Sequence, residues 1–511
     1  MSLTLARLTL VGPADTDKPA STGMRTFVRK IFSFPVALSG LLSVLAMLTV
    51  RGRFNAPDMW WHLKMGQTIW TMRAIPKIDL FSYTANHHAV VPHEWLSQLL
   101  IFTTWRMGGF SGMMLWLCVF ATVLLIAGYR LCALYSGNAK VAFVGAIAIW
   151  YFATIGFAVR PHMIGFLLLI AELMLIHLGR TRNPHWFFWL PPVFALWINC
   201  HGSFFLGIVV LGLFIFASLF HFRIGSLVSL LWPPDCRRKL IMATIFSMAA
   251  LFLNPAGIKQ ILYPLDAMLN QHVTLSVVQE YQPLQLVEGR GIAMMAMLGC
   301  CLLLPVMRKS ELFLDELLLL ILGTWLAASH QRLLFVFGIL AAPVLSRQLS
   351  TLWDGYDVAK DRIWTNAIFI GISLLTVLMA FPDRQNLEAQ VALKSPVKAL
   401  EFIKTHNMAG PMLNEFVDGG YLMWAAPEHP VFVDGRSDIY EWTGVLAEFM
   451  DWENLRTPPD TLLNKYGVQF CLLSNQSPMA RVIPLLPEWK SVYSDQNSIV
   501  FQRISTTSPA R

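Results

Sequence analysis

The chain has 511 residues, of which 55% are apolar and only 14% are charged. Soluble domains usually have about 25% charged residues, so this composition excludes an ordinary soluble protein and indicates a polytopic membrane protein. The formal net charge is +8, but the basic residues occur in twos and threes near the ends of apolar segments. This distribution is typical of basic cytoplasmic loops, and no nucleic-acid partner is expected.

About eleven segments approach the roughly 20 apolar residues that a membrane span needs. Basic residues gather at the junctions that would share one side of the membrane, which is therefore the cytoplasm. This pattern predicts a cytoplasmic tail over residues 1–30, a transmembrane domain over 31–381 and an extracytoplasmic domain over 382–511. Arg51 and Arg53 are exceptions, because they follow the first span on the outer side. The predicted spans lie near residues 31–50, 110–130, 139–157, 161–179, 185–200, 203–222, 236–254, 291–307, 312–329, 331–348 and 363–381.

The first outer loop, residues 51–109, is too polar to span a bilayer and is rich in tryptophan. Asp58 follows Pro57 and can cap a helix that runs to about Arg73, in which apolar residues recur every four positions. Residues 93–106 predict a second amphipathic helix. Because tryptophan prefers the headgroup level of a membrane, both helices are expected to lie in the membrane interface.

The tail from about residue 382 predicts a small α/β domain. No GxGxxG, P-loop or zinc-ligand spacing occurs in the chain, so nucleotide-binding and structural-zinc classes are not indicated. Turns are expected directly after the first two strands, at residues 418–421 and 434–436. The predicted elements are a helix over 395–406, strands over 412–416 and 431–433, a helix over 458–465, a strand over 468–473 and a hairpin over 491–502.

The predicted topology brings polar residues from five separate span junctions to the outer side. Ionisable groups at membrane depth are costly unless they face a cavity or a partner. A shared outer cavity explains this pattern better than five independent accidents. The residues concerned include Asp58, His62, Asp79, His93, Glu94, Arg160, His162, Asn199, His201, Glu280, His330 and Arg332.

Asp58 is the leading catalytic candidate, because a carboxylate at the outer membrane boundary can accept a proton from a hydroxyl nucleophile. The structural alternative is a helix N-cap. His93 and Glu94 form a second polar pair on the same loop. This pair could orient Asp58, bind a substrate hydroxyl, or hold a divalent cation such as Mg²⁺ or Mn²⁺ through oxygen. Its structural alternative is a cap on the second helix.

Arg160 and Arg332 are candidates to bind phosphate, because guanidinium grips phosphate bidentately and both lie where a lipid-linked phosphate would rest. The alternative is that each side chain reaches to lipid headgroups. Histidines near them can donate to phosphate or sugar oxygens. The further substrate-binding candidates are His62, His162, His201 and His330, with Asn199 (otherwise a polar turn), Glu280 (otherwise a solvated loop charge) and Arg436 (otherwise an ion pair in a turn).

Several short motifs combine polar residues with aromatic residues, glycine or proline. They are Asp58-Met-Trp-Trp-His-Leu, Ile75-Pro-Lys-Ile-Asp79-Leu-Phe-Ser-Tyr-Thr84, His93-Glu-Trp-Leu96, Trp197-Ile-Asn-Cys-His-Gly202, Asn254-Pro255, Glu280-Tyr-Gln-Pro283 and Asp434-Gly-Arg436. These motifs resemble those of the GT-C superfamily of membrane glycosyltransferases, especially its bacterial RgtA/B/C/D-like and protein mannosyltransferase-like groups. The resemblance implies that a sugar is transferred from a polyprenyl-phosphate donor on the outer membrane face. Asp58 would match the first-loop catalytic acid, and Arg160 and Arg332 would bind the donor phosphate.

The sequence thus predicts an α-helical polytopic membrane protein of about eleven spans with a GT-C-like fold and a small C-terminal extracytoplasmic α/β domain. It favours a glycosyltransferase of the bacterial inner membrane whose partners are membrane lipids, a polyprenyl-phosphate sugar donor and a glycan, lipid or protein acceptor. Two alternatives are a transporter or flippase for lipid-linked glycans and a non-catalytic assembly subunit. Internal repeats, which many transporters have, are not found in the sequence.

Overall fold

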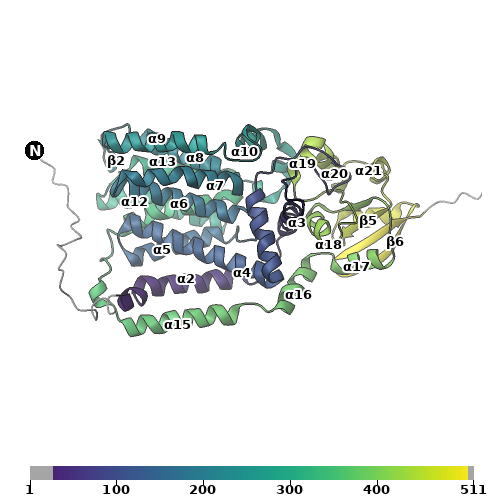
Figure 1. Ribbon diagram of the computed structural model, residues 1–511, viewed down its shortest axis with the longest axis horizontal. Coiled ribbons are helices and arrows are strands. Elements are labelled where there is room, and N and C mark those ends of the chain that lie inside the picture. Colours follow the sequence, from purple (N-terminus) through teal and green to yellow (C-terminus); the bar gives the residue numbers. More distant parts are fainter. Residues whose placement is uncertain (1–26, 505–511) are drawn as a thin grey trace, which may run out of the picture.

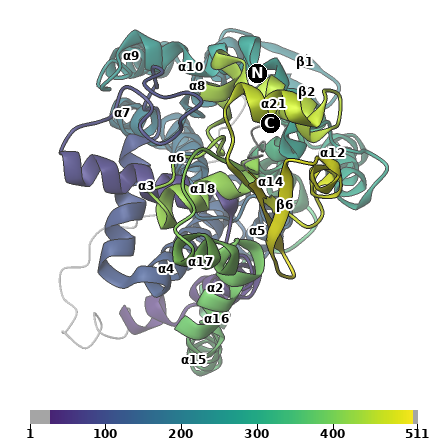
Figure 2. The ribbon, with the colours of Figure 1, turned by 90° about the vertical axis from the view of Figure 1, so that its right-hand side faces the viewer.

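The computed structural model describes residues 27–504 and shows a helical bundle that carries a smaller α/β domain at one end (Figure 1). The predicted N-terminal tail falls almost entirely outside the described residues. We call the end of the bundle beside the α/β domain the domain end, and the opposite end the far end. Figure 2 looks onto the domain end.

Helices occupy every segment that the sequence predicts to span the membrane. Among the described residues, six helical stretches are long and apolar enough to cross a membrane, by length and composition. The chain is therefore a multi-pass membrane protein and the predicted helical class is confirmed, whereas the number of spans stays a prediction. The six include α2 (Phe34–Val50), α4 (Trp95–Ser136), α6 (His162–Thr181), α12 (Gly289–Arg308), α14 (Leu334–Leu349) and α15 (Ile363–Ala380), and shorter helices in predicted spans are α5 (Ala139–Ala153), α7 (Leu190–Cys200), α8 (Phe204–Ala217), α9 (Pro234–Ala250) and α13 (Leu314–Ser329).

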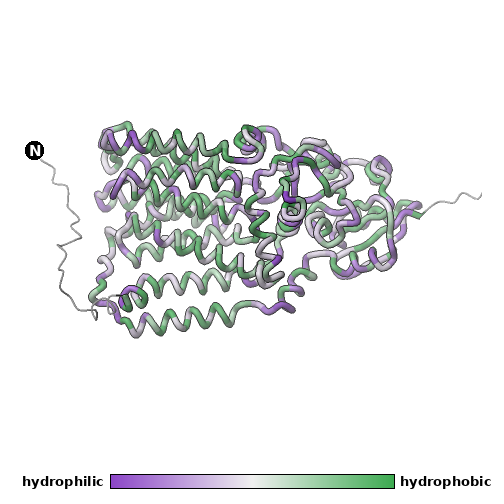
Figure 3. The backbone as a smooth tube through the Cα atoms, in the orientation of Figure 1, coloured by the Kyte–Doolittle hydropathy of each residue, from purple (hydrophilic) through white to green (hydrophobic). Residues whose placement is uncertain are grey.

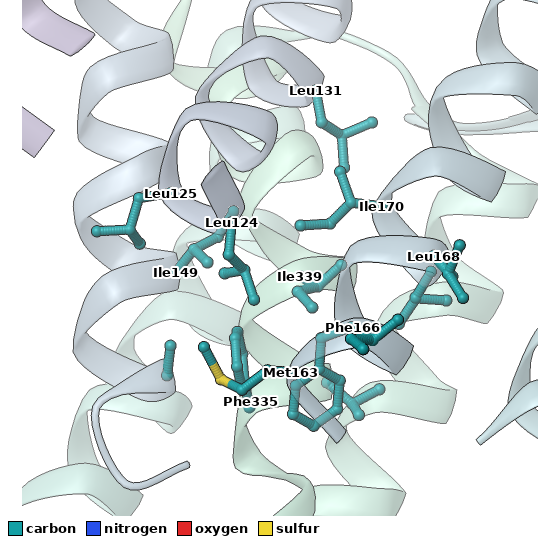
Figure 4. Packing of buried hydrophobic residues seen from close by; sticks show 14 of the residues in the cluster. Leu124, Leu125, Leu131, Ile149, Met163, Phe166, Leu168, Ile170, Phe335 and Ile339 are labelled. Carbon is teal, nitrogen blue, oxygen red and sulfur yellow. The ribbon is translucent and has the colours of Figure 1, made fainter. Parts of the chain in front are cut away.

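Apolar packing between the long helices holds the bundle together. Figure 4 shows Leu124 of α4, Ile149 of α5 and Ile339 of α14 gathered in one cluster, and all three are fully buried. Lipid chains are as apolar as these side chains, so close contact is what joins helices inside a membrane. Gly128 of α4 permits such contact, since a Cβ there would lie 2.7 Å from the Cδ1 atom of Ile149.

Hydrophobic residues fill the middle of the bundle, and hydrophilic residues collect at its two ends (Figure 3). At the far end, Arg180 lies 2.9 Å from Asp315, and Arg347 pairs with Glu316. A small sheet at this end was not predicted, because its strands are only two or three residues long. In it, β1 (Phe222–Ile224) pairs antiparallel with β2 (Leu227–Ser229), which pairs parallel with β3 (Leu312–Phe313).

Two helices of the first outer loop lie across the domain end, as the sequence predicts (Figure 1). The first is α3 (Pro57–Met72), and the second is the part of α4 before Gly109. Gly109 has φ 53° and ψ −135°, a conformation that breaks the helix and that glycine adopts at little cost. The predicted interfacial helix and the next predicted span are therefore continuous in the chain and meet at this glycine.

The chain leaves the bundle after α15 and forms the α/β domain. A four-stranded sheet in the order β4-β5-β7-β6 is its centre, with β4 parallel to β5 and the other pairs antiparallel. The strands are β4 (Met412–Asn414), β5 (Phe470–Ser474), β6 (Trp489–Ser494) and β7 (Ser498–Arg503), and the helices are α16 (Arg384–Lys394), α17 (Val397–Thr405), α18 (Phe416–Ala425), α19 (Ser437–Thr443), α20 (Val445–Glu453), α21 (Pro459–Lys465) and α22 (Pro478–Val482). Between α9 and α12 in the chain, α10 (Ile258–Asn270) lies at the domain end (Figure 1), and α11 (His272–Val277) contacts α19 and α20 of the α/β domain.

The predicted strand over residues 431–433 is wrong. Val431 makes only an isolated parallel bridge, to Ser82 of the first outer loop. Its N–H donates to the carbonyl oxygen of Phe81 at 3.0 Å, and its own carbonyl accepts from the N–H of Tyr83 at 3.2 Å. The segment therefore joins the α/β domain to the first outer loop.

The predicted turn over residues 418–421 is also wrong, because these residues belong to α18. Their glycines serve close packing. A Cβ on Gly419 would lie 2.1 Å from the carbonyl oxygen of Val433, and a Cβ on Gly420 would lie 3.0 Å from that of Pro57. As a result α18 packs directly against α3, as Figure 2 shows.

Candidate active site

Asp58 lies in the first turn of α3, but it is not the N-cap. The helix begins at Pro57 with Ala56 at the N-cap position, so the alternative that Asp58 caps this helix is wrong. Its carboxylate instead meets Arg160, with 2.8 Å between Oδ2 and Nη2, and its side chain is 24% exposed. Asp58 is therefore fixed by an ion pair while part of it remains accessible.

Arg160 joins two carboxylates from distant parts of the chain. Besides Asp58, its Nη1 atom donates to both carboxylate oxygens of Glu280, at 3.1 and 3.2 Å. Asp58 and Glu280 hold the pKa of the Arg160 guanidinium above its ordinary value although burial would lower it. For Glu280, burial would raise the pKa of the carboxyl group. The positive charges of Arg160 and Arg332 more than offset this effect and keep the pKa of Glu280 below its ordinary value.

Arg332 extends this chain of charges. Its Nη1 atom lies 3.8 Å from Glu280 and donates to the Tyr281 hydroxyl at 2.8 Å, and its guanidinium lies over the Tyr281 ring, 5.3 Å from the ring centre. A guanidinium has five N–H donors, so Arg332 retains capacity for an oxygen ligand. Tyr281 was not among the predicted site residues, although it is adjacent to Glu280 in the sequence.

A cavity of about 200 Å³ adjoins these charges. His162 lies on the wall of the cavity, and its Nε2 atom donates to the Gly156 carbonyl oxygen at 2.6 Å. Its Nδ1 atom is buried without a hydrogen-bond partner among residues 27–504. The lining residues are Ile155, Gly156, Arg160, His162, Phe166, Gln279, Glu280, Gln331 and Arg332.

Glu94 is surrounded by three histidines. Its carboxylate oxygens lie 3.7 Å from Nδ1 of His62, 3.8 Å from Nε2 of His93 and 3.6 Å from Nε2 of His201. Burial raises the pKa of Glu94. Burial together with neighbouring cationic groups lowers the pKa of His62 and of His201. Glu94 occupies the N-cap position of α4 but makes no capping hydrogen bond there within the described structure.

Two other predicted residues lie apart from these clusters. Asn199 accepts from Trp95 Nε1 at 2.7 Å and donates to the carbonyl oxygens of Ala195 and Leu253, so its amide is engaged in joining helices. The His330 ring centre is 6.3 Å from that of Tyr281, and burial lowers its pKa. Neither residue lines the cavity beside Asp58.

Arg436 lies in a buried network that joins the α/β domain to the first outer loop. It donates to Asp79 at 2.6 Å and to both oxygens of Asp434, at 2.8 and 2.6 Å. The Tyr440 hydroxyl donates to Asp434 at 2.6 Å. The Arg436 side chain is only 5% exposed, and those of Asp79 and Asp434 are fully buried. The structure thus places Arg436 behind the site instead of in the cavity.

Gly435 brings the α/β domain against the candidate catalytic residue. A Cβ at this position would lie 2.7 Å from Oδ1 of Asp58 and 2.9 Å from Nε1 of Trp61. On the other side, Tyr263 of α10 stacks on His93 with 4.0 Å between ring centres and donates to Asp438 at 3.1 Å. The sequence analysis did not identify three of these residues as part of the site. Nothing in the sequence around Gly435, Tyr263 or Asp438 distinguishes them from an ordinary turn glycine, helix residue or acidic residue.

Comparisons with known proteins identify the fold. No family model and no curated protein sequence matches the chain. Solved structures do match. The oligosaccharyltransferase AglB of Archaeoglobus fulgidus in its apo form has 12% identity and a TM-score of 0.52, over 86% of this chain and 69% of that chain. ArnT from Cupriavidus metallidurans, bound to undecaprenyl phosphate, has 10% identity and a TM-score of 0.52, over 96% and 100%.

The arabinofuranosyltransferase AftD from Mycobacteria has 13% identity and a TM-score of 0.51, over 94% of this chain and 41% of that chain. These neighbours are GT-C superfamily membrane glycosyltransferases. The chain has the GT-C fold. At such low sequence identities, the structural similarity establishes the GT-C architecture only. The reaction has to be inferred from the residues of the site.

The side chains at the candidate site do not provide a ready set of oxygen ligands for Mg²⁺, and the binding of a divalent cation stays a prediction. In the part of the chain that the structure describes, no group of three or more His, Cys, Asp or Glu side chains is arranged to hold a metal ion. The Arg160 guanidinium itself lies between Asp58 and Glu280, where a bridging cation would sit. Glu94 is faced by imidazoles, whereas Mg²⁺ prefers oxygen ligands.

Proposed function

We propose that this chain is a glycosyltransferase that moves a sugar from a polyprenyl-phosphate-linked donor to a hydroxyl-bearing acceptor. The observation that carries the proposal is the pairing of accessible Asp58 with Arg160 beside a cavity that Arg332 also lines. A general base paired with one guanidinium, beside a cavity that a second guanidinium lines, suits the transfer of a group away from phosphate. The GT-C fold supports it, since ArnT is described bound to undecaprenyl phosphate and AglB with dolichol-phosphate.

In the proposed reaction, Asp58 accepts the proton of the acceptor hydroxyl as its oxygen attacks the anomeric carbon of the sugar. The bond from that carbon to the phosphate oxygen breaks, and the polyprenyl phosphate leaves with the electron pair. Cationic groups help most where this negative charge develops. Arg332 is the better placed phosphate ligand, because Arg160 is already engaged by two carboxylates. Arg160 chiefly positions Asp58 and adds positive charge.

The acceptor and the sugar would be bound by the polar groups around Asp58. The Nε1 atom of Trp61 is buried beside Asp58 and Gly435 and has no hydrogen-bond partner within the described range. A buried donor without a partner costs about 1–3 kcal/mol, so it is suited to an acceptor oxygen. His62, His93, His201 and Glu94 would hold sugar hydroxyls, and the Nδ1 atom of His162, which has no partner within the described range, would accept from a hydroxyl group in the cavity. The acceptor class is a glycan, a lipid or a protein.

We also propose that the domain end faces the outside of a bacterial inner membrane. The support is the excess of Arg and Lys in the junctions of the far end, which is typical of cytoplasmic loops. The α/β domain and the cavity would then lie on the periplasmic or extracellular side. Polyprenyl-phosphate donors and membrane lipids would reach the cavity from the bilayer. The 24% exposure of Asp58 disfavours a non-catalytic subunit with a sealed site.

The test is Asp58→Asn in membranes supplied with a polyprenyl-phosphate-linked sugar. The substitution keeps the size of the side chain but removes the base, and loss of a general base typically costs about 10²–10⁴-fold in rate. Asp235→Asn is the control, since Asp235 is an exposed residue at the far end that pairs only with Lys239 in the described structure. Undiminished transfer by Asp58→Asn, with both variants present at equal levels, would refute the role of Asp58.

A further inference from the structure

Two arginines meet at Thr154, outside the site described above. The Nη1 atom of Arg53 donates to the backbone carbonyl oxygen of Thr154, and the Nη2 atom of Arg290 donates to its hydroxyl at 3.1 Å. Arg53 follows α2, Thr154 is the C-cap residue of α5, and Arg290 lies in the first turn of α12. Three separate elements therefore bring two positive charges to one place at the domain end.

No acidic side chain balances these charges. Throughout residues 27–504, neither Arg53 nor Arg290 has an Asp or Glu oxygen within 4.0 Å. Each guanidinium has five N–H donors, and only the single bond to Thr154 is formed by each in this part of the chain. Like charges held together repel, so the pair is stabilised when an anion lies between them. By contrast, Arg160 is paired with Asp58 and Glu280.

The surroundings of the pair indicate what kind of anion it would meet. Beside it, Tyr151 of α5 and Ile292 of α12 are exposed on the outside of the bundle, where lipid chains lie in a membrane protein. The domain end is where the helices stop and hydrophilic residues begin (Figure 3). Arginine at this level contacts headgroup phosphates. Thr154 directly precedes Ile155 and Gly156 of the cavity wall, so a lipid held here would lie next to the cavity.

We propose that Arg53, Arg290 and Thr154 form a binding site for the phosphate group of a membrane lipid. The two guanidiniums bind the phosphate oxygens, and the lipid chain lies along the apolar outer surface of α5 and α12. This site explains why Arg53 lies at the domain end, whereas most basic residues of the junctions lie at the far end, in the predicted cytoplasmic loops. It is independent of sugar transfer, so it stands or falls separately from the proposed function.

Native mass spectrometry of the full-length protein tests the site. The purified protein is titrated with phosphatidylglycerol, with undecaprenyl phosphate and with diacylglycerol, which has no phosphate. The variants are Arg53→Gln, Arg290→Gln and the double variant. Arg51→Gln is the matched control, because Arg51 is an exposed arginine two residues from Arg53 and its side chain makes no bond to Thr154. Thermal unfolding of each variant verifies that it is folded.

The double variant is expected to bind at least one phosphate lipid about tenfold or more weakly, because it has lost one to two charge-assisted hydrogen bonds to the phosphate. The control Arg51→Gln is expected to bind like the wild type. A loss confined to undecaprenyl phosphate assigns the site to a polyprenyl lipid, and a loss for phosphatidylglycerol assigns it to bulk phospholipid. Unchanged binding of both phosphate lipids by a folded double variant overturns the proposal. An equal loss in Arg51→Gln, or an equal loss of diacylglycerol, overturns it as well.

Discussion

Replacing Arg436 with methionine tests whether the buried network joins the α/β domain to the first outer loop. Methionine has a similar length but no charge, so Arg436→Met leaves Asp79 and Asp434 buried without their cation. In the wild type these carboxylates receive three bonds of 2.6–2.8 Å from the guanidinium. Removing one partner of a buried ion pair costs about 3–5 kcal/mol, because the other charge is left uncompensated.

The cost is measured by thermal unfolding of the full-length protein in detergent. For a domain of the size of the α/β domain, 1 kcal/mol shifts the melting temperature by roughly 4 °C. Arg436→Met is therefore expected to lower the melting temperature by about 12–20 °C. Arg456→Met is the control in the same domain. Its partner Asp451 is 3.3 Å away and both side chains are exposed. Such an exposed pair is worth at most about 1 kcal/mol.

The pH dependence gives a second test of Arg436→Met. In the wild type, burial would raise the pKa of Asp79, but Arg436 and the hydrogen bonds from Ser82 keep it below its ordinary value. That contribution to stability is present above the pKa of an unfolded aspartate, about 3.9, and is lost only as the pH falls through the lower folded value. Wild-type stability from this group is therefore constant between pH 8 and pH 5.

In Arg436→Met, burial acts on Asp79 without the opposing charge of the guanidinium, so the pKa of Asp79 rises above that of an unfolded aspartate. The variant is then least stable at high pH and recovers as the pH falls through the raised pKa of Asp79. Its deficit in melting temperature should be smaller at pH 5 than at pH 8. A deficit no larger than that of Arg456→Met, or one that is equal at both pH values, would refute the reasoning.

Three further outcomes are expected. Gly435→Ala places a methyl group 2.7 Å from Asp58 Oδ1 and should reduce transfer by about 100-fold, the effect of a displaced catalytic group, with little change in melting temperature; full activity would contradict this. Glu172→Gln should leave the melting temperature unchanged or higher, because both Glu172 oxygens are buried without partners among the described residues, so the substitution removes no hydrogen bond; a fall of several degrees would argue against it. Treatment with EDTA should leave the transfer rate within about twofold, since the Arg160 guanidinium lies between Asp58 and Glu280, where a bridging cation would sit; a loss that Mn²⁺ restores would show that reasoning to be mistaken.

The sequence is informative about the bundle because the physics of the membrane leaves few options. Long apolar runs must become helices there, since lipid offers no hydrogen bonds to the backbone. The same physical argument predicts that polar residues from several span junctions gather at one end of the bundle. In the structure, Asp58, Arg160, Glu280 and Arg332 do lie together at the domain end. Their order could not be predicted. Arg160 reaches Asp58 across 102 positions of the chain, and Asp58 alone looks like any acidic residue after a proline.

The α/β domain was harder to predict because its contacts are long-range and its elements are short. Arg436 meets Asp79 across 357 positions, and nothing near either residue in the sequence indicates the other. Gly419 and Gly420 have the composition of a turn, yet their role is to let α18 approach α3. Local patterns describe which residues are apolar or flexible. They do not show which surface a flexible residue will face.

These long-range contacts give the α/β domain a direct influence on the site. Asp58 is held on one side by Arg160 of the bundle, at 2.8 Å, and on the other by the backbone at Gly435. The loop that contains Gly435 is itself fixed by Arg436 to Asp79 of the first outer loop. Because α3 packs against α18 as well, the position of Asp58 depends on the bundle, the first outer loop and the α/β domain together. The domain is therefore part of the wall of the site, and its docking determines the geometry in which Asp58 can act.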